Sequence, residues 1–241
     1  NGRVSGAEVT DLETGDAFTI RAKHVIAAAG VWTEATQDLA EAQGGLKMLA
    51  SKGIHIVVPK DRLNGEVGFI LQTEKSVLFI IPWERYWVIG TTDTPYEQDY
   101  VHPVASQADI DYVIDHANVV LQKPITRDDV IGTWAGLRPL LQPATKGDGT
   151  ASTKVSREHT VTEAAPGLVT IAGGKLTTYR VMAQDAVDFA LGEAEAKARP
   201  SQTKRTPLMG AAGYQALSAQ ADTLGREFGW DGTRVRHLLD R

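Results

Sequence analysis

Short apolar runs separated by turn-forming residues fill the first ninety positions of the chain and predict strands. They occupy residues 4–10, 17–21, 23–29, 54–58, 68–71, 77–81 and 87–90. The run at 23–29 is apolar almost throughout and stops at Gly30, which is typical of a buried strand, and a helical pattern over 31–42 follows it. The last four runs have the spacing of an antiparallel sheet with short connections.

The clearest helix is predicted between Ser106 and Lys123. Ser106 is suited to the N-cap, Asp109 complements the positive end of the helix dipole, and Pro124 ends the helix. Its apolar positions form a single stripe, which consists of Ile110, Val113, Ile114, Ala117, Val120 and Leu121. Two further strands are expected at 130–137 and 154–163, with a loop rich in Gly, Pro and Thr over 141–150.

The most informative segment runs from Leu168 to Arg180, where an apolar strand passes through Gly173-Gly174 into a helical pattern. The helical spacing is carried by Leu176, Tyr179, Met182, Ala183, Ala186, Val187 and Ala190. Such a turn aims backbone N–H groups and the positive end of the helix dipole at one spot, and glycine lets another molecule approach closely. Because Lys175 adds a positive charge, the segment predicts a site for a phosphate, a carboxylate or a cofactor ring that becomes anionic on reduction.

Beyond Arg199 the character of the chain changes. Residues 200–207 resemble a linker, and two helical patterns follow at 214–228 and 233–241. From Lys197 onward there are eight Lys and Arg against four Asp and Glu, an excess of 8 − 4 = 4 positive charges. A solvated helical face is the favoured interpretation of this tail, and a membrane-binding patch is the alternative.

Composition narrows the classes of function. The 241 residues, 42% hydrophobic and 23% charged, allow one large domain or two modest ones. The net charge of −5 argues against nucleic-acid binding, and the lack of cysteine excludes disulfides, thiolate metal sites and cysteine nucleophiles. The six histidines are scattered, so no zinc site is expected, and no apolar run approaches the length of a membrane span.

Two strand residues are candidates for site chemistry. Arg138 ends an apolar strand, with Pro139 fixing the turn after it, and suits either an internal ion pair or a bidentate grip on a carboxylate or phosphate. His55 alternates with Ile54 and Ile56, so it is either a satisfied core residue or a residue facing a cavity. Taken singly, Arg157 is equally ambiguous.

Five blocks of the sequence together resemble the FAD-dependent glycerol-3-phosphate dehydrogenases. In order they are Ala28-Ala-Gly-Val-Trp-Thr33, Lys52-Gly-Ile-His-Ile-Val-Val-Pro59, Ile80-Ile-Pro-Trp83 with Ile89-Gly-Thr-Thr-Asp93, Gly136-Leu-Arg-Pro-Leu140, and Gly173-Gly-Lys-Leu-Thr-Thr-Tyr-Arg180. The resemblance implies a mixed α/β (α+β) fold of the amino-acid-oxidase-like flavoproteins. It divides the chain into part of an FAD-binding domain (1–45), a substrate-binding domain on a mixed antiparallel sheet (46–163), a return to the FAD-binding domain (164–199), and a linker with the start of a C-terminal helical domain (200–241).

The activity implied by the resemblance is oxidation of sn-glycerol 3-phosphate to dihydroxyacetone phosphate by hydride transfer to FAD. Electrons then pass to quinone, or to oxygen in oxidase relatives. The resemblance also implies a cytoplasmic protein, peripheral on the inner face of the cytoplasmic membrane, and allows a homodimer.

Residue roles follow from the matching positions. The resemblance makes His55 the candidate base, with Arg138 and Lys175 in the catalytic set and Arg138, Arg157 and Lys175 on the substrate phosphate. It assigns cofactor contacts to Gly30, Trp32, Gly173, Gly174, Lys175, Leu176 and Thr177, and a polar contact to Thr92. Arg138 and Lys175 are expected to face one cavity beside the isoalloxazine.

The sequence departs from the family pattern in its missing Gly-x-Gly-x-x-Gly turn, which in the family grips the FAD pyrophosphate and lies in the N-terminal segment. Most of the C-terminal helical domain is also missing. We therefore expect an internal fragment that is inactive by itself. Two other functions stay open: an amine or amino-acid oxidase of the same superfamily, in which one arginine would bind a carboxylate, and a non-catalytic fragment with decayed site residues.

Overall fold

The computed structural model describes residues 2–42, 45–74, 77–142 and 158–240, and it divides the chain into two units, Asn1–Glu195 and Ala196–Arg241. The first unit contains a hairpin, a three-stranded sheet and a six-stranded sheet. The second unit contains only helices among its described residues.

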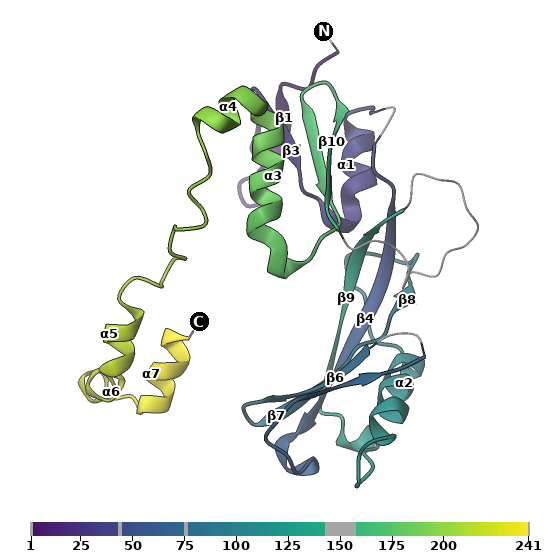
Figure 1. Cartoon of the computed structure of the whole chain (residues 1–241), viewed down its shortest axis with the longest axis vertical. Coiled ribbons are helices and arrows are strands. Elements are labelled where there is room, and N and C mark those ends of the chain that lie inside the picture. Colours follow the sequence, from purple (N-terminus) through teal and green to yellow (C-terminus); the bar gives the residue numbers. More distant parts are fainter. Residues whose placement is uncertain (1, 43–44, 75–76, 143–157, 241) are drawn as a thin grey trace. The chain divides into compact units, whose positions relative to one another are not determined.

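A six-stranded antiparallel sheet occupies the lower part of Figure 1. Its strands are β4 (Met48–Pro59), β5 (Phe69–Gln72), β6 (Val77–Trp83), β7 (Tyr86–Gly90), β8 (Thr94–Pro95) and β9 (Gly132–Leu141). The order is β5-β6-β7-β4-β8, and β9 pairs with β4 over ten residues, from Met48 opposite Leu141 to Val57 opposite Gly132. The four short strands predicted at 54–58, 68–71, 77–81 and 87–90 are therefore confirmed as an antiparallel set.

Helix α2 (Gln107–Asn118) covers one face of this sheet (Figure 1). The alternation along β4 explains why: Ile54, Ile56 and Val58 are fully buried against the helix, whereas His55 points to the opposite face. The predicted N-cap is confirmed, since Ser106 and Asp109 form a reciprocal capping box. The helix ends five residues before Lys123, because the Asn118 side chain bonds both backbone groups of Ile125 and turns the chain there.

Strands β4 and β9 are longer than predicted. Strand β4 starts at Met48 rather than Ile54, since pairing with β9 sustains an extended backbone through its polar and glycine residues. Strand β9 continues to Leu141, so the expected turn at Pro139 is wrong: Pro139 lies inside the strand, opposite Ala50. Proline is tolerated there because β9 is at the edge of the sheet, paired only with β4 among the described strands.

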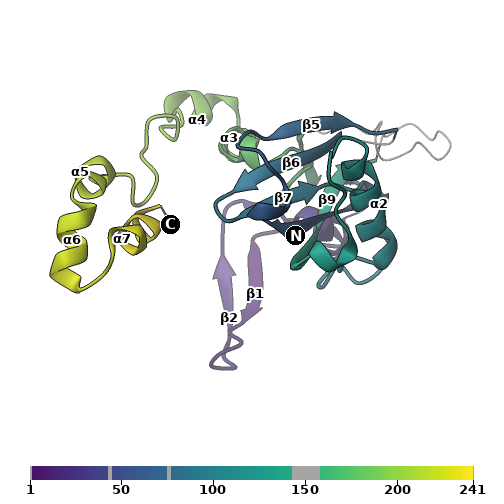
Figure 2. The ribbon, with the colours of Figure 1, turned by 90° about the horizontal axis from the view of Figure 1, so that it is seen from below.

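The upper sheet in Figure 1 joins segments from both ends of the first unit. Strand β11 (Leu168–Ala172) pairs antiparallel with β10 (Thr160–Ala165) and parallel with β3 (Val25–Ala27). The helices of this part of the chain are α1 (Thr33–Leu39), α3 (Tyr179–Leu191) and α4 (Glu193–Ala198). A hairpin of β1 (Gly6–Thr10) and β2 (Ala17–Arg21) projects from the sheets, as Figure 2 shows. Short 3-10 turns are η1 (Gly30–Trp32), η2 (Lys60–Arg62), η3 (Arg127–Asp129) and η5 (Leu176–Thr178).

The second unit holds α5 (Tyr214–Ala219), α6 (Ala221–Phe228) and α7 (Gly232–Leu239). The single helix predicted at 214–228 is broken at Gln220, which caps both α5 and α6. Helix α6 ends at Gly229 in the left-handed conformation, and Gly225 allows the Trp230 carbonyl to approach, since a Cβ there would lie 2.6 Å from that oxygen. Over the described part of the chain, the helices are too short or too polar to cross a bilayer.

Candidate active site

An apolar pocket of about 530 Å³ lies where β11 runs into the diglycine turn. Its walls come from β3, β11, the first two turns of α3 and Pro139 of β9. Five of the residues predicted to contact a cofactor line it, namely Gly30, Gly173, Gly174, Lys175 and Leu176. Trp32 and Thr177 are solvent-exposed and do not line it.

The diglycine turn can be built only from glycine. Gly173 and Gly174 have φ of +81° and +73°, the left-handed region that side chains rarely adopt. A Cβ on Gly173 would lie 2.6 Å from the carbonyl oxygen of Glu158, and one on Gly174 would lie 2.5 Å from the sulfur of Met182. The turn therefore presents bare backbone to the pocket at the end of a fully buried strand.

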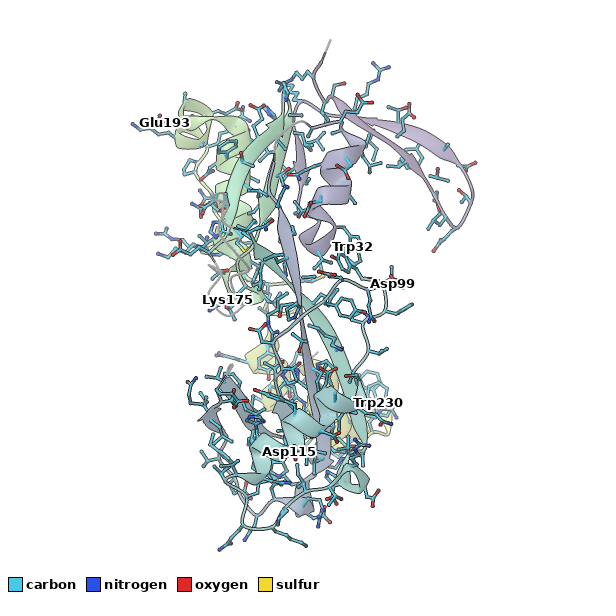
Figure 3. The ribbon with its side chains drawn as sticks, turned by 90° about the vertical axis from the view of Figure 1, so that its right-hand side faces the viewer. Trp32, Asp99, Asp115, Lys175, Glu193 and Trp230 are labelled. Carbon is cyan, nitrogen blue, oxygen red and sulfur yellow. The ribbon has the colours of Figure 1, made fainter. Side chains whose placement is uncertain are left out.

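The charge at this turn comes from Lys175 and the start of α3. Lys175 lies at the level where the two sheets of the first unit meet (Figure 3). Its backbone N–H donates to Thr178 Oγ1 over 3.1 Å, which closes the 3-10 turn before α3 begins at Tyr179. Apolar walls, a backbone edge without side chains and one cation suit a large planar ring that gains negative charge at one edge, so this pocket fits an isoalloxazine.

A second group of predicted residues lies on the open face of the six-stranded sheet, opposite α2. Arg138 pairs with Ser51 and Trp134 pairs with His55 across β9 and β4, so these four side chains share this face. The His55 and Trp134 rings stack with centroids 5.1 Å apart and 13° between their planes. The Arg138 guanidinium donates to the Thr92 carbonyl oxygen over 3.1 Å and to Thr91 Oγ1 over 3.0 Å.

Two glycines make room for these side chains. A Cβ on Gly53 would lie 2.4 Å from Arg138 Nη2, and a Cβ on Gly90 would lie 2.5 Å from His55 Cδ2. The arginine and the histidine therefore lie flat across neighbouring backbones. Sequence reasoning missed Gly53, Gly90 and Trp134 as site residues, although each stands within or next to a matched block. Gly90 and Trp134 both pair with His55, on β7 and β9 respectively.

The environment favours a neutral imidazole at His55. Burial lowers the pKa of His55 below its ordinary value of 6.5, and the Arg138 guanidinium lowers this pKa further. A neutral imidazole accepts a proton, whereas the permanently charged guanidinium beside it attracts an anion. The open face therefore combines a proton acceptor with an anion-binding cation.

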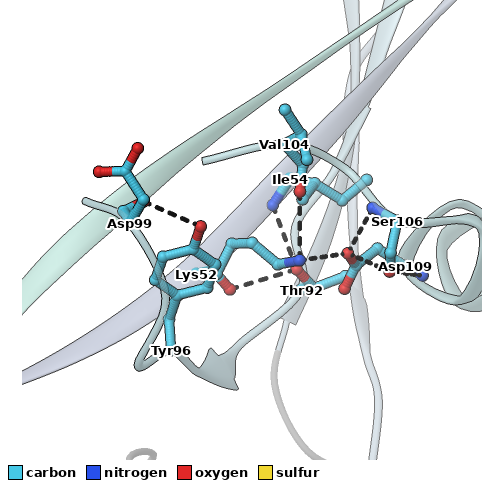
Figure 4. A network of polar contacts seen from close by, with 8 residues as sticks. All are labelled: Lys52, Ile54, Thr92, Tyr96, Asp99, Val104, Ser106 and Asp109. Atoms are coloured by element: carbon cyan, nitrogen blue, oxygen red, sulfur yellow. Dashed lines mark hydrogen bonds and ion pairs between the residues drawn. The ribbon is translucent and has the colours of Figure 1, made fainter. Parts of the chain in front are cut away.

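A buried polar network holds the strand that carries His55 (Figure 4). Thr92 Oγ1 accepts from the Ile54 N–H and donates to the Lys52 carbonyl, so this threonine, 3% exposed, joins the chain after β7 to β4. Lys52 Nζ lies 2.7 Å from Asp109 Oδ2 on α2. Burial alone would raise the pKa of Asp109, but hydrogen bonds from Lys52 and Ser106 lower it below its ordinary value.

The structure does not bring all the predicted residues together. Pro139, the neighbour of Arg138, lines the apolar pocket with Lys175, whereas Arg138 is not among the described residues of its wall. The expected single cavity for Arg138 and Lys175 is thus replaced by two adjacent groups that share β9. Arg157 lies outside the described residues.

Comparison with known proteins identifies the family. Residues 1–180 match the model of the DAO family, described as FAD dependent oxidoreductase. Glycerol-3-phosphate dehydrogenase 2 of Mycobacterium tuberculosis is 50% identical over 239 residues, which are 99% of this chain and 40% of that protein. The human mitochondrial glycerol-3-phosphate dehydrogenase is 36% identical over 240 residues, 98% of this chain and 32% of that protein.

A solved structure agrees with these matches. The glycerol-3-phosphate dehydrogenase of Bacillus halodurans, crystallised with FAD, superimposes with a TM-score of 0.81 and 33% identity, covering 98% of this chain and 46% of that one. The chain thus spans less than half the length of these relatives. Its fold is that of the amino-acid-oxidase-like flavoproteins, and the chain belongs to the FAD dependent oxidoreductase family.

Proposed function

We propose that this chain supplies the substrate-binding sheet and one wall of the flavin pocket of an enzyme that oxidises sn-glycerol 3-phosphate to dihydroxyacetone phosphate. The observation that carries the proposal is the placement of Arg138 beside a neutral His55 on the open face of the sheet. The names of the relatives supply the substrate, since both sequence relatives and the Bacillus halodurans structure are glycerol-3-phosphate dehydrogenases.

Arg138 holds the substrate phosphate in this proposal, with Arg157 and Lys175 as further cations. A charge-assisted hydrogen bond contributes about 1.5–3 kcal/mol, which corresponds to about ten- to hundredfold in binding. This gain in binding free energy lets the site prefer glycerol 3-phosphate to glycerol, which has no phosphate. Gly53 beside Arg138 and Gly90 beside His55 carry no side chain, which leaves room for a small substrate to lie against the sheet.

His55 removes the proton of the C2 hydroxyl. Its lowered pKa keeps the imidazole neutral at neutral pH, and stacking on Trp134 fixes the orientation of the ring. Bound FAD would accept the hydride from C2. Lys175 and the start of α3 stabilise negative charge at the edge of the pocket, and Gly30, Gly173, Gly174 and Leu176 provide its walls.

Several finer assignments belong to the same proposal. Residues 1–45 and 164–199 contribute to the FAD domain, 46–163 form the substrate domain, and 200–241 begin a helical domain after a linker. Quinone is the proposed electron acceptor, at the inner face of the cytoplasmic membrane. Detergent-free fractionation and a quinone-reduction assay test these two assignments.

The main test is anaerobic reduction of the flavin in the FAD-loaded enzyme that contains this chain. Glycerol 3-phosphate should bleach the flavin absorbance, whereas glycine and sarcosine should not. In steady state, Arg138→Ala should raise KM for glycerol 3-phosphate by about ten- to hundredfold. The matched control is Arg127→Ala, which removes an exposed arginine paired with Asp111 and should leave KM unchanged.

Two results would contradict the proposal. Faster reduction by glycine or sarcosine would assign the chain to the amino-acid oxidases instead. An unchanged KM in Arg138→Ala would remove Arg138 from the phosphate site.

A further inference from the structure

Three consecutive residues after β7 surround the Arg138 guanidinium. Thr92 offers its carbonyl oxygen, Thr91 its hydroxyl and Asp93 its carboxylate, whose Oδ1 lies 3.9 Å from Arg138 Nη1. The guanidinium is about a quarter exposed, whereas the side chain of Asp93 is only 1% exposed. Arg138 therefore faces the open side of the sheet while its charge partner is buried beneath it.

Asp93 is held by a residue directly across from Arg138. Ser51, which pairs with Arg138 in the β4–β9 register and is fully buried, donates its hydroxyl proton to Asp93 Oδ1. A buried carboxylate is stable only where hydrogen bonds and a cation compensate its lost hydration. Because Ser51 and Arg138 both compensate this carboxylate, its position and that of the guanidinium depend on each other.

We propose that Asp93, fixed by Ser51, is the positioning residue for Arg138: it holds the guanidinium over Gly53 in the orientation that receives the substrate phosphate. The inference deepens the proposed function and depends on it for the identity of the anion. Asp93 itself does not touch the substrate, since it is buried. Without it, the guanidinium loses its buried charge partner and the flat arrangement across Gly53 loses its anchor.

The test is a double-mutant cycle in the FAD-loaded enzyme that contains this chain. Asp93→Ala should raise KM for glycerol 3-phosphate tenfold or more with a smaller change in kcat, and Asp93→Asn, which keeps an acceptor for Ser51, should give a smaller rise. In an Arg138→Ala background, Asp93→Ala should raise KM no further, because a positioning residue acts only through its target. An additional tenfold rise in that background, or an unchanged KM in the single variant, would overturn the inference.

Matched variants separate positioning from general damage. Asp111→Ala removes a carboxylate from the exposed Arg127 pair and should leave KM at the wild-type value. Where Asp93→Ala fails to fold, Ser51→Ala removes one hydroxyl and should produce the same non-additive rise in KM. An additive rise for Ser51→Ala counts against the inference.

A second measurement needs no turnover and separates this inference from the proposed function. Modification of Arg138 by phenylglyoxal, followed by mass spectrometry of the peptides, should be several-fold faster in Asp93→Ala than in the wild type, while Arg62 serves as an internal reference. An unchanged rate would refute the positioning role even if glycerol 3-phosphate proves to be the substrate. A faster rate in an enzyme that does not oxidise glycerol 3-phosphate would keep the positioning role and refute only the substrate.

Discussion

The packing at Gly53 makes a prediction at the scale of single residues. Gly53→Ala would place a methyl group 2.4 Å from Arg138 Nη2 and 2.6 Å from Thr91 Oγ1, so the guanidinium must move. We expect KM for glycerol 3-phosphate to rise about tenfold, the effect of one charged hydrogen bond. Steady-state kinetics check this, with Gly132→Ala as the control, since a Cβ there meets only the Val57 side chain at 3.8 Å. A wild-type KM in Gly53→Ala would show that Arg138 does not need the space that Gly53 leaves beside its guanidinium.

A second prediction at this scale concerns pH. The pKa of His55 is lowered from 6.5, first by burial and then by Arg138, so the neutral base persists into mildly acidic solution. The second-order rate constant of flavin reduction, measured below saturation and therefore reporting the substrate-free protein, should fall through protonation of His55 only below pH 6.5. In Arg138→Ala the acidic limb should move to higher pH, because the nearby cation is gone. Stopped-flow mixing across pH 5 to 8 measures both profiles, and a limb above pH 6.5 in the wild type would exclude His55 as the base.

The sequence alone predicted on which face of its strand His55 lies, but not which side chains lie next to the candidate site residues. The alternation around His55 placed it off the Ile54–Ile56 face, and the structure confirms that it lies opposite the core. Trp134, which stacks on His55, lies 134 − 55 = 79 positions away in the chain, and Thr91, a partner of Arg138, lies 138 − 91 = 47 positions away. Only the register of β4 with β7 and β9 fixes those encounters, and no local pattern carries this register.

At the scale of secondary-structure elements, the contact between β4 and α2 depends on the buried pair of Lys52 and Asp109. Asp109→Asn leaves the ammonium group of Lys52 buried without its charge partner, which should lower the free energy of unfolding by about 3–5 kcal/mol. Urea denaturation near neutral pH measures this change. Asp111→Asn is the control, since its solvent-exposed ion pair with Arg127 contributes little to the free energy of unfolding. A loss as small as that of the control would show that α2 is held by its apolar stripe alone.

The same pair has a definite pH dependence. The pKa of Asp109 in the folded protein lies below its ordinary value of 3.8, because the bonds from Lys52 and Ser106 outweigh the effect of burial. The carboxylate therefore stabilises the fold above that pH, and the stabilisation is lost as the pH falls through the lowered pKa. In Asp109→Asn this part of the acid unfolding profile should disappear.

Elements with strong local signals were predicted well, and elements that depend on distant pairing were not. The N-cap at Ser106 and the strand before Gly173 are local features, and the structure confirms both. The first six residues of β4 and the last four of β9 were missed, because each is extended only through the other. Asn118 ended α2 early through a side-chain bond to Ile125, which helical periodicity does not reveal.

At the scale of the whole molecule, the division into two units predicts where a protease acts first. Lys204 and Arg205 are exposed, lie outside regular helices and stand between Glu195 and the start of α5. Brief trypsin treatment should cut after these residues before it cuts within strands β4 and β9 of the first unit, because cleavage requires an exposed and locally open backbone. Mass spectrometry of the fragments checks the order. Earlier cleavage within β4 or β9 would contradict the division.

The alternation of side chains along β9 sets the scale of the proposed reaction centre. Arg138 lies on the open face of the six-stranded sheet, and Pro139, the next residue, forms part of the wall of the apolar pocket. Successive residues of a strand point to opposite sides, with Cα atoms about 3.8 Å apart. The proposed anchor for the substrate phosphate and the wall of the pocket proposed for the flavin are thus joined by a single peptide unit. The spacing of their two backbone attachment points is fixed by covalent geometry, so sliding of one layer against another cannot change it.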